Sequence, residues 1–473
     1  MTFPRASDEG GPQWIQVTTP HFALATDMDR EPAGELSRTL ESWWAAMGVA
    51  FPEGMAPAAV SGDPEPILVV ALRDSSERDA VHYQYGGLFA ALPLLPPAIS
   101  VGDFDDEHGR ETLKHELAHA FLHQRLPRVP NWLTEGMAVY LQTAEIDSRR
   151  GVVQWGFWNA SEMRNVLEYG GGMSVASIMD RRKWAAGKAI GEMELYAGLL
   201  VHMLINRRPA ELECYLKRLA TEIDTDAALT CFTGRDKWDF ELRDYAYSWS
   251  FARKTVAFDS RDTYGRITPL GDARVHATLA LLDFAALFTV LPQFREERVA
   301  RALANVARAL TIEPDEYLGL LLTLTRTEVD ERRHGQITQA LVAKHPGDWR
   351  AWVARAQTPG LPFSETTQAM DRAWSLAPQQ TEVIRLAAIR ALQEGRWNDA
   401  RALGIKAWLG GADEASDRLV LFLASALGGS CTEASRWSRS PSDTKAFNDR
   451  LADVQKEAGL PMTSCPSPAT GGR

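Results

Sequence analysis

Three prolines in the second half of the chain, Pro314, Pro346 and Pro378, stand 32 residues apart. Each follows an amphipathic stretch rich in alanine and leucine, and no strand pattern occurs after about Ala273. Proline ends a helix because it lacks the backbone N–H and clashes with the preceding turn. A fixed period of this length is typical of stacked pairs of helices, so nearly half of the chain is expected to be all-helical.

The segment from Leu392 to Ala400 resembles the tetratricopeptide repeat, because leucine, glycine, an aromatic residue and alanine follow one another at its intervals. Small residues recur in register with the prolines, although Leu341 interrupts that register. The resemblance implies a repeat-like helical domain over residues 259–440 with a protein partner on its surface, and an irregular helical bundle is the alternative. Residues 441–473 are polar and are expected to form a disordered tail.

The first half of the chain mixes strand and helix patterns. A hairpin is expected over residues 14–17 and 22–25, and two further strands over 67–72 and 98–101. A helix with one apolar face is expected over residues 31–47. The predicted fold class is therefore α+β. A small mixed sheet with helices occupies residues 1–258, and the all-α region follows it.

Composition places the chain among ordinary globular proteins. It has 473 residues, of which 45% are hydrophobic, and this excludes wholesale disorder. The 62 acidic residues outnumber the 51 basic ones, which gives a net charge of −11. A nucleic-acid binder needs a basic face to displace counterions, so no nucleic acid is expected as a partner.

The sequence features that bear on the cell compartment point to the cytoplasm. No apolar run approaches the roughly 18 residues that a membrane span needs, and the N-terminus lacks the apolar core of a secretory signal. The four cysteines are sparse and form no C-x-x-C pair, so reduced thiols in a cytoplasmic protein are expected. A bridge between Cys214 and Cys231 is the alternative if the protein is exported.

One motif carries chemistry: His115 and His119 flank Glu116 within a helical pattern over residues 113–124. Histidines four residues apart project from the same side of a helix, so both imidazoles can reach one metal ion. A glutamate between them can take a proton from a water on that metal. The motif therefore predicts a zinc site with Glu116 as general base.

A second helical segment follows a proline-containing loop and begins near Asn131, which is a suitable N-cap residue. Together the two segments resemble the gluzincin metallopeptidases, specifically the peptidase MA-like families, whose pattern is HExxH followed by W-L-x-E-G-x-A. The second half of that pattern is matched by Trp132, Leu133, Glu135, Gly136 and Ala138.

The resemblance implies a zincin-like catalytic domain over residues 1–258 that binds one Zn²⁺ and hydrolyses a peptide or protein substrate. Glu135 is then the third zinc ligand beside His115 and His119. Three protein ligands leave the fourth position of zinc to water, which is the layout of a catalytic site. The acid that orients a ligand histidine is open between Glu111, Glu145 and Asp147.

Aminopeptidase-like gluzincins also carry a catalytic tyrosine beyond the glutamate ligand, and the resemblance assigns that role to Tyr196, with His202 as the alternative. The chain departs from their Tyr-x-Lys-Gly pattern, because the lysine is missing and Gly198 comes one residue early. Their Gly-x-Met-Glu-Asn motif is also absent, and Gly86-Gly87-Leu88-Phe89 is the nearest feature. An endopeptidase is therefore expected rather than an aminopeptidase.

Two other functions compete with a zinc endopeptidase. One is a catalytically silent scaffold that keeps the peptidase-like unit for protein interaction. The other is a zinc hydrolase of a non-peptide amide or ester. The intact set of His115, Glu116, His119 and Glu135 favours the peptidase over the scaffold.

Overall fold

The structure is a computed structural model. It describes residues 3–50, 65–74, 87–101, 107–126, 128–158, 166–168, 173–180, 184, 190–221, 225–248, 253–259, 263, 265–287, 292–411, 414–438 and 465.

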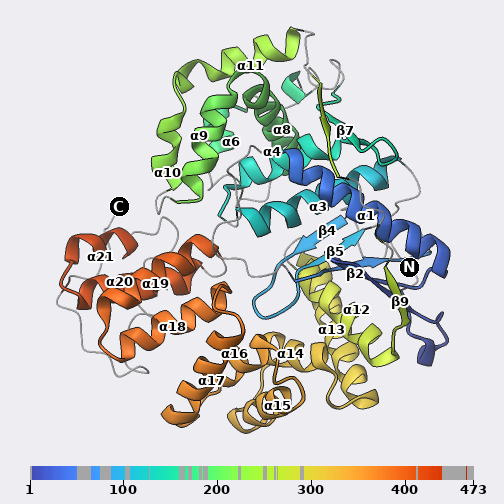
Figure 1. Cartoon of the computed structure of the whole chain (residues 1–473), viewed down its shortest axis with the longest axis vertical. Helices are drawn as coiled ribbons and strands as arrows, with labels where there is room; N and C mark the ends of the chain where they lie inside the picture. The colour runs from blue at the N-terminus through green and yellow to red at the C-terminus, as the bar shows by residue number, and fades with distance from the viewer. Residues whose placement is uncertain are drawn as a thin grey trace. The chain divides into compact units, whose positions relative to one another are not determined.

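The chain divides into two compact units, with the main division between Leu322 and Thr323. The first unit contains a small sheet and many helices, and the second is all-helical in its described part (Figure 1). The α+β class is therefore confirmed. The predicted domain boundary at residue 258 lies inside the first unit.

A six-stranded mixed sheet organises the first unit, in the order β4-β5-β3-β2-β1-β9. β2 pairs with β3 and β3 with β5 in parallel, while the other three pairs are antiparallel. The strands are β1 (Ile15–Thr18), β2 (Phe22–Thr26), β3 (Ile67–Ala71), β4 (Gly87–Ala90), β5 (Ala98–Val101) and β9 (Arg266–Pro269).

Both faces of the sheet are covered by helices. All five residues of β3 are buried, as expected for a central strand with no polar face. Ile67, Val69 and Ala71 belong to one core with α1 (Arg30–Ala50) and α3 (Glu107–Arg125). α12 (Asp272–Ala286) lies on the other side of the sheet (Figure 1).

These strands confirm the predicted hairpin and the predicted strands at 67–72 and 98–101. β4 and β9 were not predicted. β4 (Gly-Leu-Phe-Ala) has no β-branched residue, and β9 (Arg-Ile-Thr-Pro) ends in a proline, which lowers the tendency to form a strand. The register of β9 against β1, from Ile15–Pro269 to Thr18–Arg266, joins residues on both sides of position 258 in one sheet. This pairing is the physical reason why the first unit continues beyond the predicted boundary.

Helices and a second, three-stranded sheet complete the first unit around the metal-motif helix α3. α4 (Asn131–Gln142) begins at Asn131 as predicted, but Pro130 rather than Asn131 occupies the cap position. The remaining elements are β6 (Glu145–Asp147), β7 (Val152–Trp155), β8 (Lys254–Ala257), α6 (Val175–Met179), α8 (Ile190–Arg207), α9 (Pro209–Leu219), α10 (Thr225–Ala228), α11 (Trp238–Tyr247) and α13 (Pro292–Ile312).

The proline period coincides with helix ends. Pro314, Pro346 and Pro378 each lie two residues beyond the last residue of a helix, namely α13, α15 and α17. Beyond α14 (Tyr317–Arg326), the second unit consists of α15 (Glu331–Lys344), α16 (Trp349–Ala356), α17 (Phe363–Leu376), α18 (Thr381–Gln393), α19 (Trp397–Gly410), α20 (Glu414–Leu427) and α21 (Cys431–Ser438).

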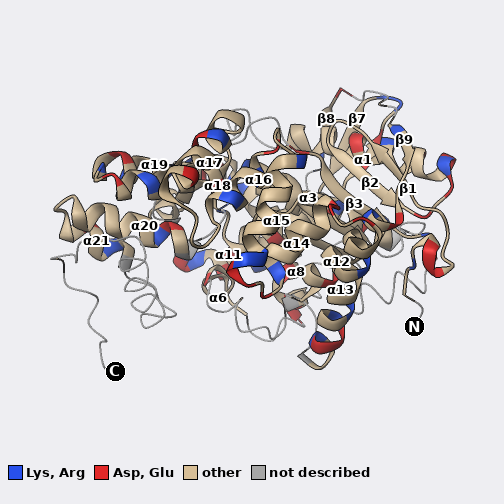
Figure 2. Cartoon of the chain, turned by 90° about the horizontal axis from the view of Figure 1, so that it is seen from below, with Lys and Arg blue, Asp and Glu red and all other residues tan. Residues whose placement is uncertain are grey.

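Helices that follow one another in the second unit pack side by side, from α15 through α21. Within it, the buried Arg385 of α18 contacts Asp417 of α20 at 2.6 Å, so helices that are not consecutive are also held together. Basic and acidic side chains are interspersed along the elements in the view of Figure 2, as the composition indicates.

The cysteines correct one prediction. Cys214 pairs with Cys231 and Cys431 pairs with Cys465, so the four thiols are oxidised rather than reduced. Except for Cys465, the predicted tail over residues 441–473 lies outside the described residues. Among the described helices, none combines the length and the apolar character that crossing a membrane requires.

Candidate metal centre

The metal motif lies in the middle of α3, where Leu113, Leu117 and Phe121 anchor the helix in the core. His115 and His119 project from one side of α3, with their ring centroids 4.7 Å apart. Their side chains are 15% and 13% exposed, so both rings are nearly enclosed but can still be reached by solvent. The predicted spacing therefore brings both imidazoles to one place.

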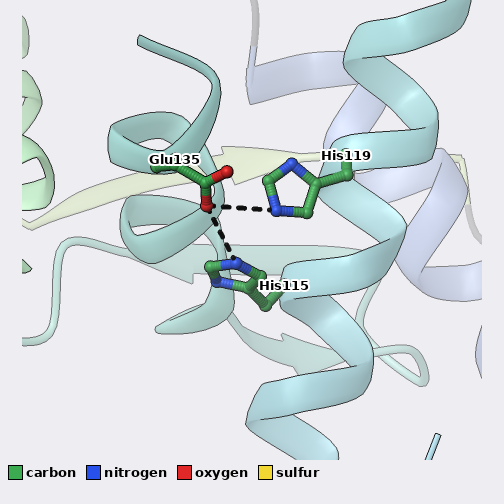
Figure 3. A group of neighbouring side chains, drawn as sticks. All are labelled: His115, His119 and Glu135. Atoms are coloured by element: carbon green, nitrogen blue, oxygen red, sulfur yellow. Dashed lines mark ion pairs between the residues drawn. The ribbon is translucent and has the colours of Figure 1, made fainter. Parts of the chain in front are cut away.

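α4 brings Glu135 to the two histidines (Figure 3). Its Oε2 atom lies 3.5 Å from Nε2 of His115 and 3.3 Å from Nε2 of His119. One ligand atom from each of the three side chains lies within 4.8 Å of the others. Within the described residues this is the one group of His, Cys, Asp and Glu side chains with such geometry.

A close approach of α4 and α8 positions Glu135. Gly136 faces the backbone of α8, where an added Cβ would lie 2.6 Å from the carbonyl oxygen of Ala197. Gly198 of α8 in turn leaves room for Val139 of α4. Two glycines therefore allow the helices to touch at backbone distance, and the residue next to Gly136 is held firmly.

Gln142 orients His115 from the end of the same helix α4. Its Oε1 atom lies 2.8 Å from Nδ1 of His115. An amide oxygen only accepts, so Nδ1 of His115 donates to Gln142, and Nε2 is the nitrogen that faces Glu135. Gln142 therefore takes the orienting role for which Glu111, Glu145 and Asp147 were the candidates from the sequence.

Glu116 projects toward the edge strand β4. A Cβ on Gly87 would lie 2.8 Å from Cγ of Glu116, so the glycine makes room for this carboxylate. Burial raises the pKa of Glu116, while the charges of His119 and His115 and a hydrogen bond from the backbone N–H of Phe89 lower it. The balance of these effects leaves the pKa of Glu116 above its ordinary value.

The three ligand side chains stabilise one another's charge. Burial opposes ionisation of Glu135, but the charge of His119 and hydrogen bonds from both histidines hold its pKa far below the usual range. Burial likewise disfavours the charged form of His115, yet its hydrogen bond to Glu135 and the charges of Glu116 and Glu135 raise its pKa to about 9. Glu135 is therefore held as a carboxylate beside the two histidines, which is the form of the side chain that binds a metal ion.

Tyr196 lies on α8. It is 4% exposed and belongs to the core of the first unit. Burial raises the pKa of Tyr196 to about 12; the charge of Asp239 adds to this increase, and the charge of Arg243 opposes it. Both charged neighbours belong to α11 rather than to the metal motif. Among the described residues, no hydrogen bond or ion pair joins the Tyr196 hydroxyl to the two histidines, and the catalytic role expected of Tyr196 remains a prediction.

His202 occupies a buried polar cluster. Its Nδ1 atom lies 2.5 Å from the hydroxyl of Tyr245 and 3.1 Å from Nδ2 of Asn206, and its ring stacks on Trp158. Burial lowers the pKa of His202 to about 4. These contacts are those of a hydrogen-bonded core histidine.

Glu194 is the residue that sequence reasoning missed. It lies on α8, two residues before Tyr196, and is half-buried. Burial and the charge of Glu135 raise the pKa of Glu194, while His115 and His119 lower it. Its carboxylate therefore lies within electrostatic reach of the metal ligands. To find Glu194 from the sequence, one would have to know which side of α8 faces α4, and no motif defines that side.

No protein-family model, curated protein or solved structure matches this chain. The function of the site therefore has to be argued from its own residues.

Proposed function

We propose that the chain is a zinc-dependent metallopeptidase of the gluzincin type, in which Glu116 is the general base. The observation that carries this proposal is the convergence of His115, His119 and Glu135 within 4.8 Å, with Glu116 adjacent on the same helix. These residues come from two helices, α3 and α4, so their convergence is a property of the fold and not of the motif alone.

The donor set fits zinc. Two imidazole nitrogens and one carboxylate oxygen are the protein ligands of catalytic zinc, which keeps its fourth position for water. When bound, zinc lowers the pKa of that water to about 7 and polarises the substrate carbonyl group. Gln142 keeps Nε2 of His115 available for this ion.

Glu116 moves the proton. Its raised pKa suits a carboxylate that accepts a proton from water and later donates it to the leaving amine. The backbone of β4 limits where this side chain can go, because Phe89 donates a hydrogen bond to it and Gly87 lies against its Cγ. Glu116 therefore works from a fixed position.

The edge strand β4 favours a peptide as substrate. β4 ends the order of the described strands, so its far edge pairs with no other strand in the described part of the chain, and β4 contacts α3 beside Glu116. An extended peptide can add to such an edge through main-chain hydrogen bonds, which would lay a peptide bond next to the general base. A small non-peptide amide gains nothing from a strand edge.

The all-helical second unit is proposed to bind a protein partner. Helix pairs that stack along the chain expose an extended surface, which is how repeat proteins bind extended segments. Deleting the segment from Thr323 onward should then leave cleavage of short peptides intact and weaken that of a protein substrate. Equal loss on both substrates would contradict this role.

Metal analysis and peptide cleavage test the catalytic proposal together. The purified wild type should contain about one zinc per chain, which His119→Ala should lose. Glu116→Gln should keep the zinc and lose cleavage of a peptide library, because an amide cannot accept the proton. Equal zinc in wild type and His119→Ala would refute the site, and full zinc without any turnover would favour the scaffold function.

A further inference from the structure

The two helices that carry the metal ligands form a hairpin, the α3–α4 hairpin, with one closed and one open end. α3 and α4 pack against each other, and residues 126–130 join them at the closed end. Nε2 of His119 lies 3.3 Å from Oε2 of Glu135, near the start of α4. One turn earlier on α3, Nδ1 of His115 lies 2.8 Å from Oε1 of Gln142, the last residue of α4. The helices therefore run antiparallel, and their loop fastens only one end.

Lys114 fastens the open end. Its Nζ atom donates a hydrogen bond of 2.9 Å to the carbonyl oxygen of Ala144, which lies two residues beyond the end of α4. The N–H of Ala144 in turn donates to the carbonyl oxygen of Leu141 at 3.0 Å, so the acceptor is tied to the last turn of the helix. An ammonium group is favoured there, because the carbonyl end of a helix carries partial negative charge and a charged donor makes the stronger hydrogen bond.

This contact bears directly on the metal ligands. Lys114 immediately precedes His115, and Ala144 follows Gln142 by two residues, so the ammonium contact and the contact that orients His115 lie at the same end of the hairpin. The three ligand atoms that lie within 4.8 Å of one another come from both helices, so a change in the separation of α3 and α4 moves them apart. A functional site tolerates displacements of only about 0.5 Å, and this separation therefore has to be held.

Apolar packing alone does not set this separation. Leu113 and Leu117 of α3 and Leu141 of α4 are buried in the same core. Their packing is favourable but not directional, because the hydrophobic effect depends on the area removed from water. A hydrogen bond to a fixed carbonyl oxygen, in contrast, has a preferred length and direction. The half-buried Lys114 thus adds a directed contact between the two helices.

We infer that Lys114 is a positioning residue of the metal centre, whose ammonium group holds the open end of the α3–α4 hairpin at the separation that zinc binding requires. The inference rests on the zinc site of the proposed function, and it adds to that site a residue that is not itself a ligand. Because Lys114 acts through the distance between two helices, its loss should change how tightly the ion is bound and how the ligands are arranged around it.

Zinc affinity and the spectrum of a substituted ion test this role in the full chain. Lys114→Met keeps an unbranched apolar stem and removes the donor. It should raise the dissociation constant for zinc, measured against a chromophoric chelator, on the order of tenfold, as expected for the loss of a charged hydrogen bond. With Co²⁺ in place of zinc, the visible absorption should change too, because it depends on the coordination geometry. Lys114→Arg, which can donate to the same carbonyl oxygen, should restore the affinity to within about twofold and restore the spectrum.

Lys406→Met is the matched control. Nζ of Lys406 donates to Oε1 of Gln379 at 2.8 Å, and Lys406 is half-buried like Lys114, but both residues belong to the second unit. This variant should keep the zinc affinity and the Co²⁺ spectrum of the wild type. Urea unfolding of the metal-free proteins compares their stabilities. If Lys114→Met does not fold, Lys114→Gln takes its place, because its shorter, neutral donor should weaken zinc binding in the same direction.

Three results would overturn the inference: an unchanged zinc dissociation constant in Lys114→Met, an equal loss of affinity in Lys406→Met, or no recovery in Lys114→Arg. Failure of the proposed function looks different, because it is a wild type that binds zinc and cleaves no peptide. In that protein the dissociation constants and the Co²⁺ spectra still decide the role of Lys114. A wild type that binds no zinc refutes the metal centre and the inference together.

Discussion

At the residue scale, Gln142 decides which nitrogen of His115 faces the other ligands. Its Oε1 atom lies 2.8 Å from Nδ1, so replacing it with the apolar, similarly shaped methionine removes the acceptor and lets the ring turn or change tautomer. We expect Gln142→Met to weaken zinc binding roughly 10- to 100-fold. Competition with a chromophoric chelator measures this change.

The matched variant Gln142→Glu keeps an acceptor at the same position. It should bind zinc at least as tightly as the wild type, because a carboxylate accepts the Nδ1 proton more strongly than an amide does. If Gln142→Met and Gln142→Glu bind zinc alike, the hydrogen bond does not orient the ligand.

His202 makes stability depend on pH. Its pKa is about 4 in the fold because the ring is buried, against 6.5 for a free histidine. The unfolded chain therefore takes up a proton that the folded chain resists, and stability falls as the pH drops from 6.5 toward 4. The part due to His202 is about 3 kcal/mol across this window.

Urea unfolding of wild type and His202→Gln at pH 7.5 and pH 4.5, both without metal, isolates this part. The free energy of unfolding should fall in both proteins between pH 7.5 and pH 4.5, and it should fall less in His202→Gln than in the wild type. Parallel losses would show that His202 is not held neutral by the fold. His202→Gln should also be less stable at pH 7.5, because the contact with the hydroxyl of Tyr245 changes.

Four of the site residues were predicted from the sequence, and two, Gln142 and Glu194, were not. His115, Glu116 and His119 share one helix, where a separation of four residues fixes their side, and Glu135 followed from the family pattern. Gln142 lies two turns after Glu135 on the same face, so helical periodicity alone could have suggested it. Glu194 depends on how α8 lies against α4, which no short motif encodes.

At the scale of elements, the contact between α4 and α8 determines the geometry of the metal centre. Gly136→Ala would place a Cβ 2.6 Å from the carbonyl oxygen of Ala197, which is backbone and cannot rotate away. We expect a loss of about 1–3 kcal/mol in stability from this overpacking. Zinc affinity should fall as well, because Glu135 moves with the helix.

Gly191→Ala is the control on α8, since nothing lies within 4 Å of its added Cβ. It should be neutral or slightly stabilising, because alanine is the better helix former. Urea unfolding and chelator competition on both variants measure the two effects. A Gly136→Ala protein as stable and as zinc-competent as Gly191→Ala would mean that the helices can separate without cost to the site.

Elements with strong periodicity were predicted, whereas the short strands β4 and β9 were not. The helices over 31–47 and 113–124 and the buried strand over 67–72 have many apolar residues in one phase, so their patterns survive in any context. β4 has four residues, and only its pairing with β5 defines it as a strand. This is the strand that borders Glu116, so the sequence could not show how the proposed general base is positioned.

At the scale of the whole molecule, the first unit extends to Leu322 because β9 pairs with β1 across the chain. The change from mixed to helical patterning near Ala273 is real in the sequence, yet α12 and α13 belong to the first unit. A change in pattern marks a change in local structure. It does not mark a domain boundary when a later strand returns to an earlier sheet.

Two disulfides, one in each unit, bear on where the chain folds. Cys214–Cys231 closes a separation of 17 residues and Cys431–Cys465 one of 34. Such bonds form in oxidising compartments and are rare in the cytoplasm. They therefore argue against the cytoplasmic location predicted from the sequence and favour a chain that is exported.

Reduction should then destabilise the protein. Loop closure gives about 3 kcal/mol for the shorter bridge and about 4 kcal/mol for the longer one. The paired variants Cys214→Ser/Cys231→Ser and Cys431→Ser/Cys465→Ser should each unfold at a lower urea concentration than the wild type without reductant. With reductant, which opens every remaining bridge, the wild type and both variants should unfold at nearly the same urea concentration. Mass spectrometry after alkylation counts the thiols. Four alkylated thiols in protein expressed into an oxidising compartment would contradict both bridges and restore the reduced, cytoplasmic interpretation.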